Sequence, residues 1–472
     1  MPNNVGMVMS RSIFAIASVL LLSFPIYTQE PPADRETRIK QLETQVQAIL
    51  VELQKLKSES PSQTAVAVKP TETKPADTAE TQPKLGVDIG KGIRLIPYGT
   101  LFFNAYGNSG GTNNADVPLF ATLSGSGNVS ASARQTRLGL RLEGARLGNA
   151  RLGAVIEGDF FGGFPSVGIG ENFGVVRLRL AYARLDWERT SVTVGQDWMV
   201  FAPVNPVSIA AAGNPQMGAG GNLWARLPQV RVDQKLNSNL TVQAAALESQ
   251  TGDFATNAAF VVQPTSGQAS RVPFLQSRLA YSNANWLGTK KSGSIGVSGH
   301  FGMSRVITGP ANTRNDVESI GVALDWNFPV AERVTVAGEA FSGRNLGGFQ
   351  GGVFQSYNTD FAHSDGVRLT PAGVRSIGTR GGWMQVGYTP PVLNNQLGIY
   401  GSLGIDDPVN SDLVSLSFRD WRSRNFVIAA NALYRFTPQL AVSAEFRRFR
   451  TDYLFTGPRY ATHLNLGATY TF

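Results

Sequence analysis

Arginine is the residue type through which this chain could recognise a ligand. After residue 85 the sequence has 29 Arg and four Lys against 25 Asp and Glu. A guanidinium is a rigid, permanently charged fork that binds carboxylates and phosphates through two parallel hydrogen bonds. These arginines stand singly in alternating segments, whereas a nucleic-acid-binding protein clusters its cations on one face. The distribution indicates many separate guanidiniums that face water and attract small anions, and it predicts no nucleic-acid partner.

Residue types for metal, redox or acid–base chemistry are scarce. The 472 residues contain no Cys and three His, which are His300, His363 and His463. A hydrolase would need a serine activated by one of these histidines, and no such serine is evident beside His463. The Gly-rich stretches lack the following helix that phosphate binding requires. We therefore predict no enzymatic activity, no metal site and no cofactor.

The elements that would position the arginines alternate between apolar and polar residues. In 320–328 and in 426–436, large apolar side chains occupy every second position. Such segments run to about ten residues, the length of a transmembrane strand, and only a closed barrel leaves no unpaired backbone in lipid. By this alternation the charged residues predicted to face inward are Arg137, Arg141, Glu143, Glu157, Asp159, Arg231, Arg278, Asp325, Arg435, Glu445 and Arg447.

The connections between these segments alternate in length. Short turns are expected at 328–333, 388–396 and 436–440, and long connections at 107–131, 250–271, 343–377 and 450–460. Outer-membrane barrels have short turns on one side and long loops on the other. The predicted fold class is therefore all-β: a closed antiparallel transmembrane barrel of about sixteen strands over residues 94–472, with a short N-terminal coiled-coil helix.

The first 93 residues divide into three parts. Residues 1–29 have a basic start and a short apolar run, as a cleaved secretory signal does. Residues 58–93 contain four prolines among polar residues and are predicted to be a flexible linker. Between them, 34–57 predicts an oligomerising coiled coil, with a lone amphipathic helix as the alternative. Its heptad seam is Ile39, Leu42, Val46, Ile49, Leu53 and Leu56.

The chain ends on a strand with the pattern G-x-x-Y-x-F, formed by Gly467, Tyr470 and Phe472. This pattern resembles the terminal-strand signal that the outer-membrane barrel assembly machinery reads. It predicts a bacterial outer-membrane location, with outer-membrane lipids around the barrel and the N-terminal stalk in the periplasm.

Two further segments resemble trimeric bacterial porins. Residues 177–185 read RLRLAYARL, and residues 194–201 read VGQDWMVF. In those porins an Arg–Leu–Ala–aromatic strand precedes a Gly-Gln strand, which leads into a loop that folds into the lumen. The matching loop here is about 198–223. With its N-terminal coiled coil and linker, the chain resembles the DcaP-like porins, and the resemblance implies a sixteen-stranded homotrimer that admits small, often anionic solutes.

The resemblance also places Arg179 in the wall beside this loop. We expect a positive wall of Arg137, Arg141, Arg179 and Arg231, opposed across the lumen by Asp197, Glu157 and Asp159. The full set of predicted pore-lining cations is Arg137, Arg141, Arg179, Arg231, Arg278, Arg435 and Arg447.

The predicted function is passive diffusion of small hydrophilic solutes, with a preference for anions such as carboxylates. The alternative is a structural role, in which the stalk tethers the barrel to the envelope with little transport. Solute entry into liposomes separates the two.

Overall fold

The computed structural model describes residues 86–90, 92–163, 174–251, 257–258, 261–262, 264–309 and 311–472. The predicted signal peptide, the coiled-coil seam and most of the predicted linker lie outside these residues. No helix within the described ranges is long and apolar enough to cross a membrane.

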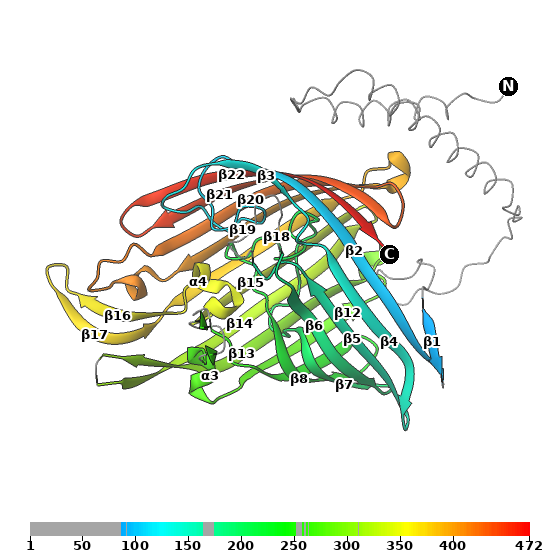
Figure 1. Cartoon of the computed structure of the whole chain (residues 1–472), viewed down its shortest axis with the longest axis horizontal. Helices are drawn as coiled ribbons and strands as arrows, with labels where there is room; N and C mark the ends of the chain where they lie inside the picture. The colour runs from blue at the N-terminus through cyan, green and yellow to red at the C-terminus, as the bar shows by residue number, and fades with distance from the viewer. Residues whose placement is uncertain are drawn as a thin grey trace, which may run out of the picture. The chain divides into compact units, whose positions relative to one another are not determined.

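The described chain is an antiparallel sheet that closes on itself (Figure 1). Its 18 segments form sixteen barrel strands, because β3 and β4 are two halves of one strand beside β2 and because β1 pairs only with the start of β2. The first nine segments are β1 (Val87–Gly90), β2 (Ile93–Asn108), β3 (Asn128–Ser132), β4 (Arg137–Leu147), β5 (Ala150–Asp159), β6 (Arg177–Asp186), β7 (Thr190–Trp198), β8 (Arg226–Lys235) and β9 (Leu240–Leu247). The other nine are β12 (Phe274–Asn283), β13 (Gly293–Thr308), β14 (Thr313–Ala331), β15 (Val334–Arg344), β18 (Gly378–Tyr388), β19 (Leu397–Pro408), β20 (Arg422–Arg435), β21 (Leu440–Tyr453) and β22 (Gly457–Thr471).

The remaining elements lie in the connections. They are the strands β10 (Asn257–Ala258), β11 (Val261–Val262), β16 (Tyr357–Ser364) and β17 (Leu369–Ser376), and the helices α3 (Ser266–Ser270), α4 (Gly351–Phe354), η1 (Trp286–Gly288), η2 (Gly347–Phe349), η3 (Leu393–Asn395) and η4 (Asn410–Leu413).

The barrel is closed by its first and last long strands. β2 pairs with β22 from Thr100 and Thr471 to Asn108 and His463. Just beyond this ladder, Phe472 N donates to Gly99 O at 3.0 Å and Gly99 N donates to Phe472 O at 3.1 Å. The terminal residue of the predicted G-x-x-Y-x-F pattern therefore takes part in closing the barrel.

The two faces of the sheet have the reverse of a soluble protein's polarity. On β22, Leu464 and Leu466 point outward and are 58% and 64% exposed, whereas His463 and Asn465 point inward and are buried. The same alternation runs along β13, β14 and β20. A barrel in a lipid bilayer needs an apolar outer face and a polar inner face.

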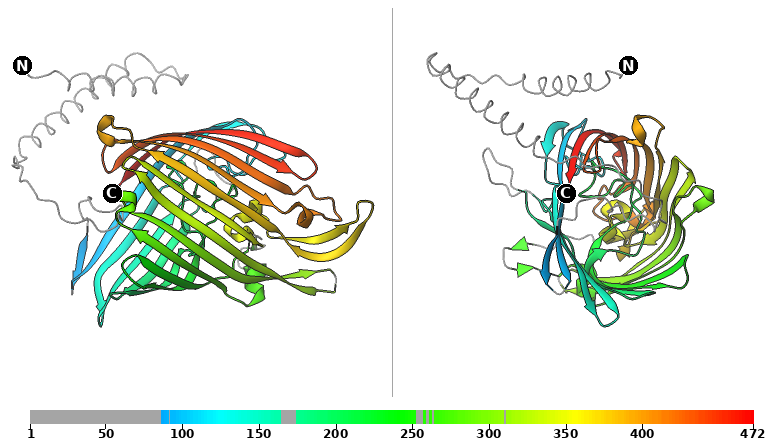
Figure 2. Two further views of the ribbon diagram at one scale, coloured as in Figure 1. Left: turned by 180° about the vertical axis from the view of Figure 1, so that it is seen from behind. Right: turned by 90° about the vertical axis from the view of Figure 1, so that its right-hand side faces the viewer.

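The long connections gather at one end of the barrel and the short turns at the other (Figure 2). Two expectations from the sequence are wrong. The stretch 450–460 is not a long loop, because β21 and β22 continue to a three-residue turn at 454–456. The linker does not extend to residue 93, because β1 already pairs with β2 from Val87. In both places Gly, Pro and polar residues look like loop in the sequence, although here they sit in hydrogen-bonded strand.

Candidate solute constriction

The connection between β7 and β8, residues 199–225, is held inside the barrel, and we call it the inward loop. Its backbone N–H groups at Val200 and Phe201 both donate to Gln276 Oε1 on β12, at 3.1 Å. Leu223 N donates to Glu339 Oε1 on β15 at 3.0 Å. A loop bonded to the inner face of well-separated strands must cross the lumen. The predicted range of about 198–223 matches this connection closely.

Further anchors fix the middle of the inward loop to the far wall. Gln385 on β18 accepts from Val207 N at 2.9 Å and donates to Val207 O at 3.1 Å. Glu445 on β21 accepts from Ser208 Oγ at 2.5 Å and from Gln216 Nε2 at 2.9 Å. Each anchor is an amide or carboxylate on an inward position of a strand. The polar inner face therefore serves to hold the loop as well as to contact water.

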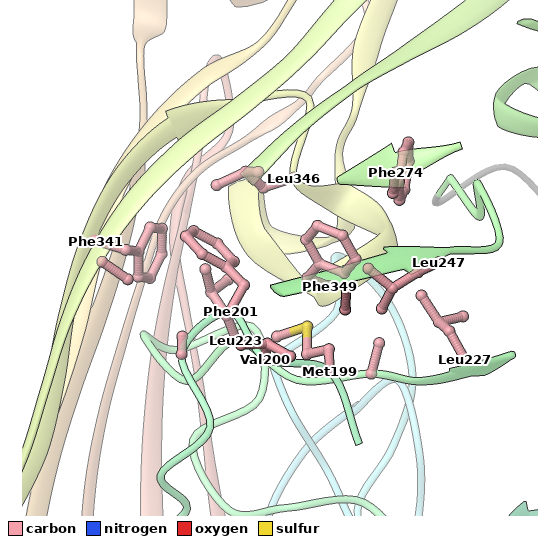
Figure 3. Packing of buried hydrophobic residues seen from close by; sticks show 14 residues of the cluster. Met199, Val200, Phe201, Leu223, Leu227, Leu247, Phe274, Phe341, Leu346 and Phe349 are labelled. Carbon is pink, nitrogen blue, oxygen red and sulfur yellow. The ribbon is translucent and has the colours of Figure 1, made fainter. Parts of the chain in front are cut away.

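Both ends of the inward loop are also anchored by apolar packing (Figure 3). Phe201 and Leu223 pack with Phe341 of β15, with Phe274 of β12 and with Phe349 of η2. Phe201 and Phe349 lie 6.2 Å apart between ring centroids. The 345–377 connection thus covers the inward loop from the long-loop end, and burial of these rings holds both segments to the wall.

The tip of the inward loop, residues 210–213, presents its carbonyl oxygens to arginines of the near wall. Gly213 O accepts from Arg177 Nη2 at 2.6 Å and from Arg226 Nη2 at 3.1 Å. Ala212 O accepts from Arg137 Nη2 at 3.2 Å and Arg179 Nη1 at 3.4 Å. These four arginines, which we call the arginine cluster, therefore converge on two adjacent carbonyl groups.

Gln135 and Phe161 fix the tip against the arginine cluster. The buried Gln135 side chain accepts from Gly213 N at 2.6 Å and donates to Ala210 O at 3.1 Å. A Cβ at position 213 would meet the Phe161 ring at 3.0 Å, so glycine permits this close approach. Phe161 itself lies between the guanidiniums of Arg134 and Arg177, at 3.8 and 4.9 Å from its centroid. Such cation–π contacts help to hold both guanidiniums in place.

Two carboxylates of β5 neutralise part of this positive charge. Arg179 Nε donates to Glu157 at 2.6 Å and its Nη1 to Asp159 at 2.9 Å, while Arg177 Nη2 donates to Asp159 at 2.7 Å. The expected negative wall across the lumen is therefore wrong for these acids, which belong to the same wall as the arginines. Asp197 is likewise beside its cation, 3.0 Å from Arg231.

The charge of this wall remains positive overall. Arg134 and the four members of the arginine cluster give five positive charges, against three negative charges from Asp116, Glu157 and Asp159, a net of two. Two of their donors, Arg137 Nε and Arg226 Nη1, are buried without a hydrogen-bond acceptor among the described residues.

Other predicted pore residues lie elsewhere along the barrel. Arg141 stacks on Tyr98 at 5.3 Å and lies 3.7 Å from Glu143. Arg278 pairs with Asp325 through bonds of 2.9 and 2.6 Å.

Two more predicted cations are apart from the arginine cluster. The buried Arg447 is paired with Glu445 under the inward loop. Arg435 is exposed at the short-turn end of β20, four residues beyond Asn431, which bonds the loop. At about 3.3 Å per residue, Arg435 is more than 10 Å from that contact along the strand.

Arg177, Arg226 and Gln135 were not among the predicted site residues. All three were missed because the alternation of inward and outward residues is interrupted where they lie. β6 bulges at Arg179, because Glu157 pairs with Leu180 while Gly158 pairs with Leu178. The bulge brings Arg177 and Arg179 inward, and also Arg184 after the parity change. The pairing of β6 with β7 ends at Ala181 and Gln196. Beyond that point no β6 residue is paired with β7, and Arg226, the first residue of the neighbouring strand β8, can reach the inward loop. The feature of the sequence that could have identified these arginines is the density of Arg next to a loop.

A serine does lie beside a histidine, although not one suited to catalysis. His300 Nε2 is 2.9 Å from Ser319 Oγ, and that hydroxyl donates to Asn345 O at 2.8 Å. Since the serine hydrogen is used by Asn345, His300 must donate to the serine oxygen and does not act as its base. Both residues are buried, with His300 packed edge-on against Phe274 and Phe349.

Comparison with protein-family models and with curated sequences finds no match. Among solved structures, the outer membrane channel DcaP of Acinetobacter baumannii is similar at a TM-score of 0.60 and 20% identity, over 82% of this chain and 99% of that one. Salmonella typhi OmpF, solved with daunomycin, matches at a TM-score of 0.50 and 14% identity, over 82% and 100%. An anion-selective porin from Comamonas acidovorans matches at 0.48 and 15%, over 80% and 100%. The matches to DcaP and OmpF show that the chain has their closed barrel fold along nearly the whole length of those two proteins.

Proposed function

We propose that this protein is an outer-membrane porin that lets small hydrophilic solutes diffuse passively and prefers anions. The observation that carries the proposal is the inward loop, whose tip meets a wall with a net charge of two positive units. Ions that enter such a constriction lose part of their water and interact with fixed charges. A positive wall raises the local concentration of anions over cations.

The arginine cluster supports carboxylates as the preferred solutes. A guanidinium offers parallel donors that match a carboxylate, and the four guanidiniums of the arginine cluster converge beside the tip of the inward loop. In the proposed route, a carboxylate passes along the arginine cluster and the inner wall and leaves without any covalent step.

The remaining parts of the proposal concern assembly. The chain is exported by the signal in 1–29, inserted by the barrel assembly machinery and held as a homotrimer in outer-membrane lipids. The seam at Ile39–Leu56 keeps the three periplasmic stalks together. The shared fold of the A. baumannii outer membrane channel supports the outer-membrane location in this proposal.

Liposome swelling tests the transport role. Liposomes that contain the purified chain are expected to swell in isosmotic arabinose and, faster, in the sodium salt of a small dicarboxylate. A lack of swelling in either solute, with folded protein in the membrane, would favour a structural envelope role instead.

A further inference from the structure

Two arginines face each other across the turn between β4 and β5. Arg146 near the end of β4 is the register partner of Arg151 near the start of β5, and we call the two the mouth pair. Their turn lies at the short-turn end of the barrel (Figure 1), which faces the periplasm in the proposed function. Arg151 lies about 20 Å along β5 from Glu157, so the mouth pair is separate from the constriction.

A bulge in β4 turns Arg146 toward the lumen. Between the pair Leu142–Ala154 and the pair Ala145–Leu152, β4 has one residue more than β5. The extra residue reverses which positions of β4 face inward, and without it Arg146 would face the lipid. Bulges at the rims of barrels commonly redirect a side chain in this way.

Gly144 is the residue that permits this bulge. Its φ is +89°, and a Cβ at this position would meet Gly92 O at 2.1 Å. Glycine adopts such a conformation without a steric cost, and it leaves room for the close backbone contact. The inward direction of Arg146 is therefore encoded in the sequence of β4.

Arg151 points inward from β5. It has the same parity as Glu157 and Asp159, which contact the arginine cluster from the same strand. The Cα atoms of directly opposed residues in an antiparallel pair are about 4.5–5.5 Å apart. The mouth pair thus holds two guanidiniums side by side on the lumen face, where like charges repel each other.

Neither arginine of the mouth pair forms a hydrogen bond or an ion pair with its side chain among the described residues, and both are exposed. Asp186 of β6 is the register partner of Arg151. Its carboxylate instead accepts from Arg184 Nε at 2.8 Å and from Ser191 Oγ at 2.6 Å. The mouth pair therefore has no carboxylate of its own.

The lumen wall on this side of the constriction is positive. The inward charged residues of β4, β5 and β6 between the constriction and the short turns are Arg141, Arg146, Arg151, Arg184, Glu143 and Asp186. Arg141 lies 3.7 Å from Glu143, and Arg184 lies 2.8 Å from Asp186. The net charge of two positive units thus resides on the mouth pair.

We infer that the mouth pair binds a small, doubly charged oxyanion at the periplasmic end of the lumen. Two adjacent guanidiniums offer parallel N–H donors to the oxygens of one anion. A dianion equals the excess charge of the mouth pair, whereas a singly charged anion neutralises half of it. The inference rests on the proposed function and deepens it, because it adds a second anion site that distinguishes solutes by their charge.

Block of chloride current through single channels tests the inference, with sulfate as the probe and acetate as the singly charged comparison. Sulfate is added to one side of the bilayer at a time. Because the mouth pair lies at one end of the lumen, we expect sulfate to block the full-length wild-type protein at a lower concentration from one side. Acetate should need at least about a tenfold higher concentration, and Arg146→Gln/Arg151→Gln should raise the half-blocking concentration of sulfate at least about fivefold. Removal of a like-charge pair is not expected to impair folding.

The matched control is Lys235→Gln/Arg435→Gln. It also removes two positive charges from the short-turn end, where both residues are exposed on β8 and β20. These two strands do not pair with each other, so the two side chains do not form an adjacent pair. At physiological ionic strength the control should keep the half-blocking concentration within about twofold of the wild type. Equal losses in the control and in the mouth-pair variant would overturn the inference. So would equal sulfate block of the mouth-pair variant and the wild type, or equal block by acetate and sulfate.

Sulfate binding in detergent separates this inference from the proposed function. Isothermal titration calorimetry of the folded, full-length protein reports binding without conduction, and the mouth-pair variant should bind sulfate more weakly than the wild type and the control do. Such binding by a protein that forms no channel would contradict the transport role and leave the sulfate site in place. Anion-selective channels whose sulfate block is the same in both double variants would overturn the site and leave the transport role in place.

Discussion

Arg179 and Glu157 form an ion pair of 2.6 Å across β6 and β5, and Arg179 is the residue at which β6 bulges. Their side chains are 3% and 7% exposed, so the pair is screened from water. Asp159 accepts a second bond from the same guanidinium at 2.9 Å. The bulge thus places one arginine where two carboxylates and the tip of the inward loop can all be reached.

Glu157→Gln is expected to destabilise the barrel. The substitution removes a charged acceptor from the buried Arg179, and loss of such a partner costs about 1–3 kcal/mol. Urea unfolding in detergent micelles, followed by tryptophan fluorescence, measures this change. Arg435→Gln serves as the control because Arg435 is exposed at the short-turn end, and it should leave the unfolding midpoint unchanged. Equal midpoints for Glu157→Gln and the wild type would show that the pair contributes nothing to stability.

Arg177→Gln and Arg226→Gln are each expected to lower anion preference several-fold. Each removes one of the two excess positive charges at the tip of the inward loop, and it also removes a donor to Gly213 O. The ratio of chloride to potassium permeability, from bilayer recordings, reports the effect. The same ratio in Arg435→Gln should be close to that of the wild type. If the three variants were indistinguishable, the arginine cluster would not set selectivity.

Gln385→Leu is expected to loosen the inward loop. One side chain holds both the N–H and the carbonyl of Val207, and leucine offers neither a donor nor an acceptor. We expect more frequent brief changes of current in single-channel traces and a stability loss of about 1–3 kcal/mol. Gln234→Leu, near the short turn after β8 and away from the loop, is the comparison. If the current changed no more often than in the wild type, the other hydrogen bonds to the inward loop would be sufficient to hold it.

Phe472→Ala separates recognition by the assembly machinery from closure of the barrel. The variant retains the backbone hydrogen bonds with Gly99 but lacks the terminal ring. In cells we expect a smaller folded fraction, seen as less heat-modifiable protein on gels. The purified, urea-unfolded variant should refold into detergent with the yield of the wild type. A defect in refolding alone would assign the ring a packing role.

The sequence predicted the fold well because alternation acts over many residues at once. In β14 from Ser319 to Asp325, the large apolar residues point outward and the small or polar residues point inward. A shift of one residue in the pairing would turn every one of these side chains to the other face of the sheet. Lengths were less predictable. β14 has 19 residues and β21 continues past 450, because polar strand residues beyond the membrane resemble those of loops.

The constriction was predictable only in part. The inward loop and Arg179 came from resemblance to a family, and Arg137 came from alternation. Alternation could not predict the partners of these arginines, since Glu157 and Asp159 were expected on an opposing wall and instead pair with Arg179 and Arg177 on the adjacent strand. Arg226 was missed because the ladder between β6 and β7 ends before it. Bulges and strand ends depend on tertiary packing, which a local pattern does not contain.

The reversal potential of single channels in a potassium chloride gradient tests the central claim most directly. Purified protein is inserted into a planar bilayer with a tenfold gradient of the salt. A channel lined by the arginine cluster should show a reversal potential near the equilibrium potential of chloride. A reversal potential near that of potassium, or an absence of conductance from folded protein, would contradict the account.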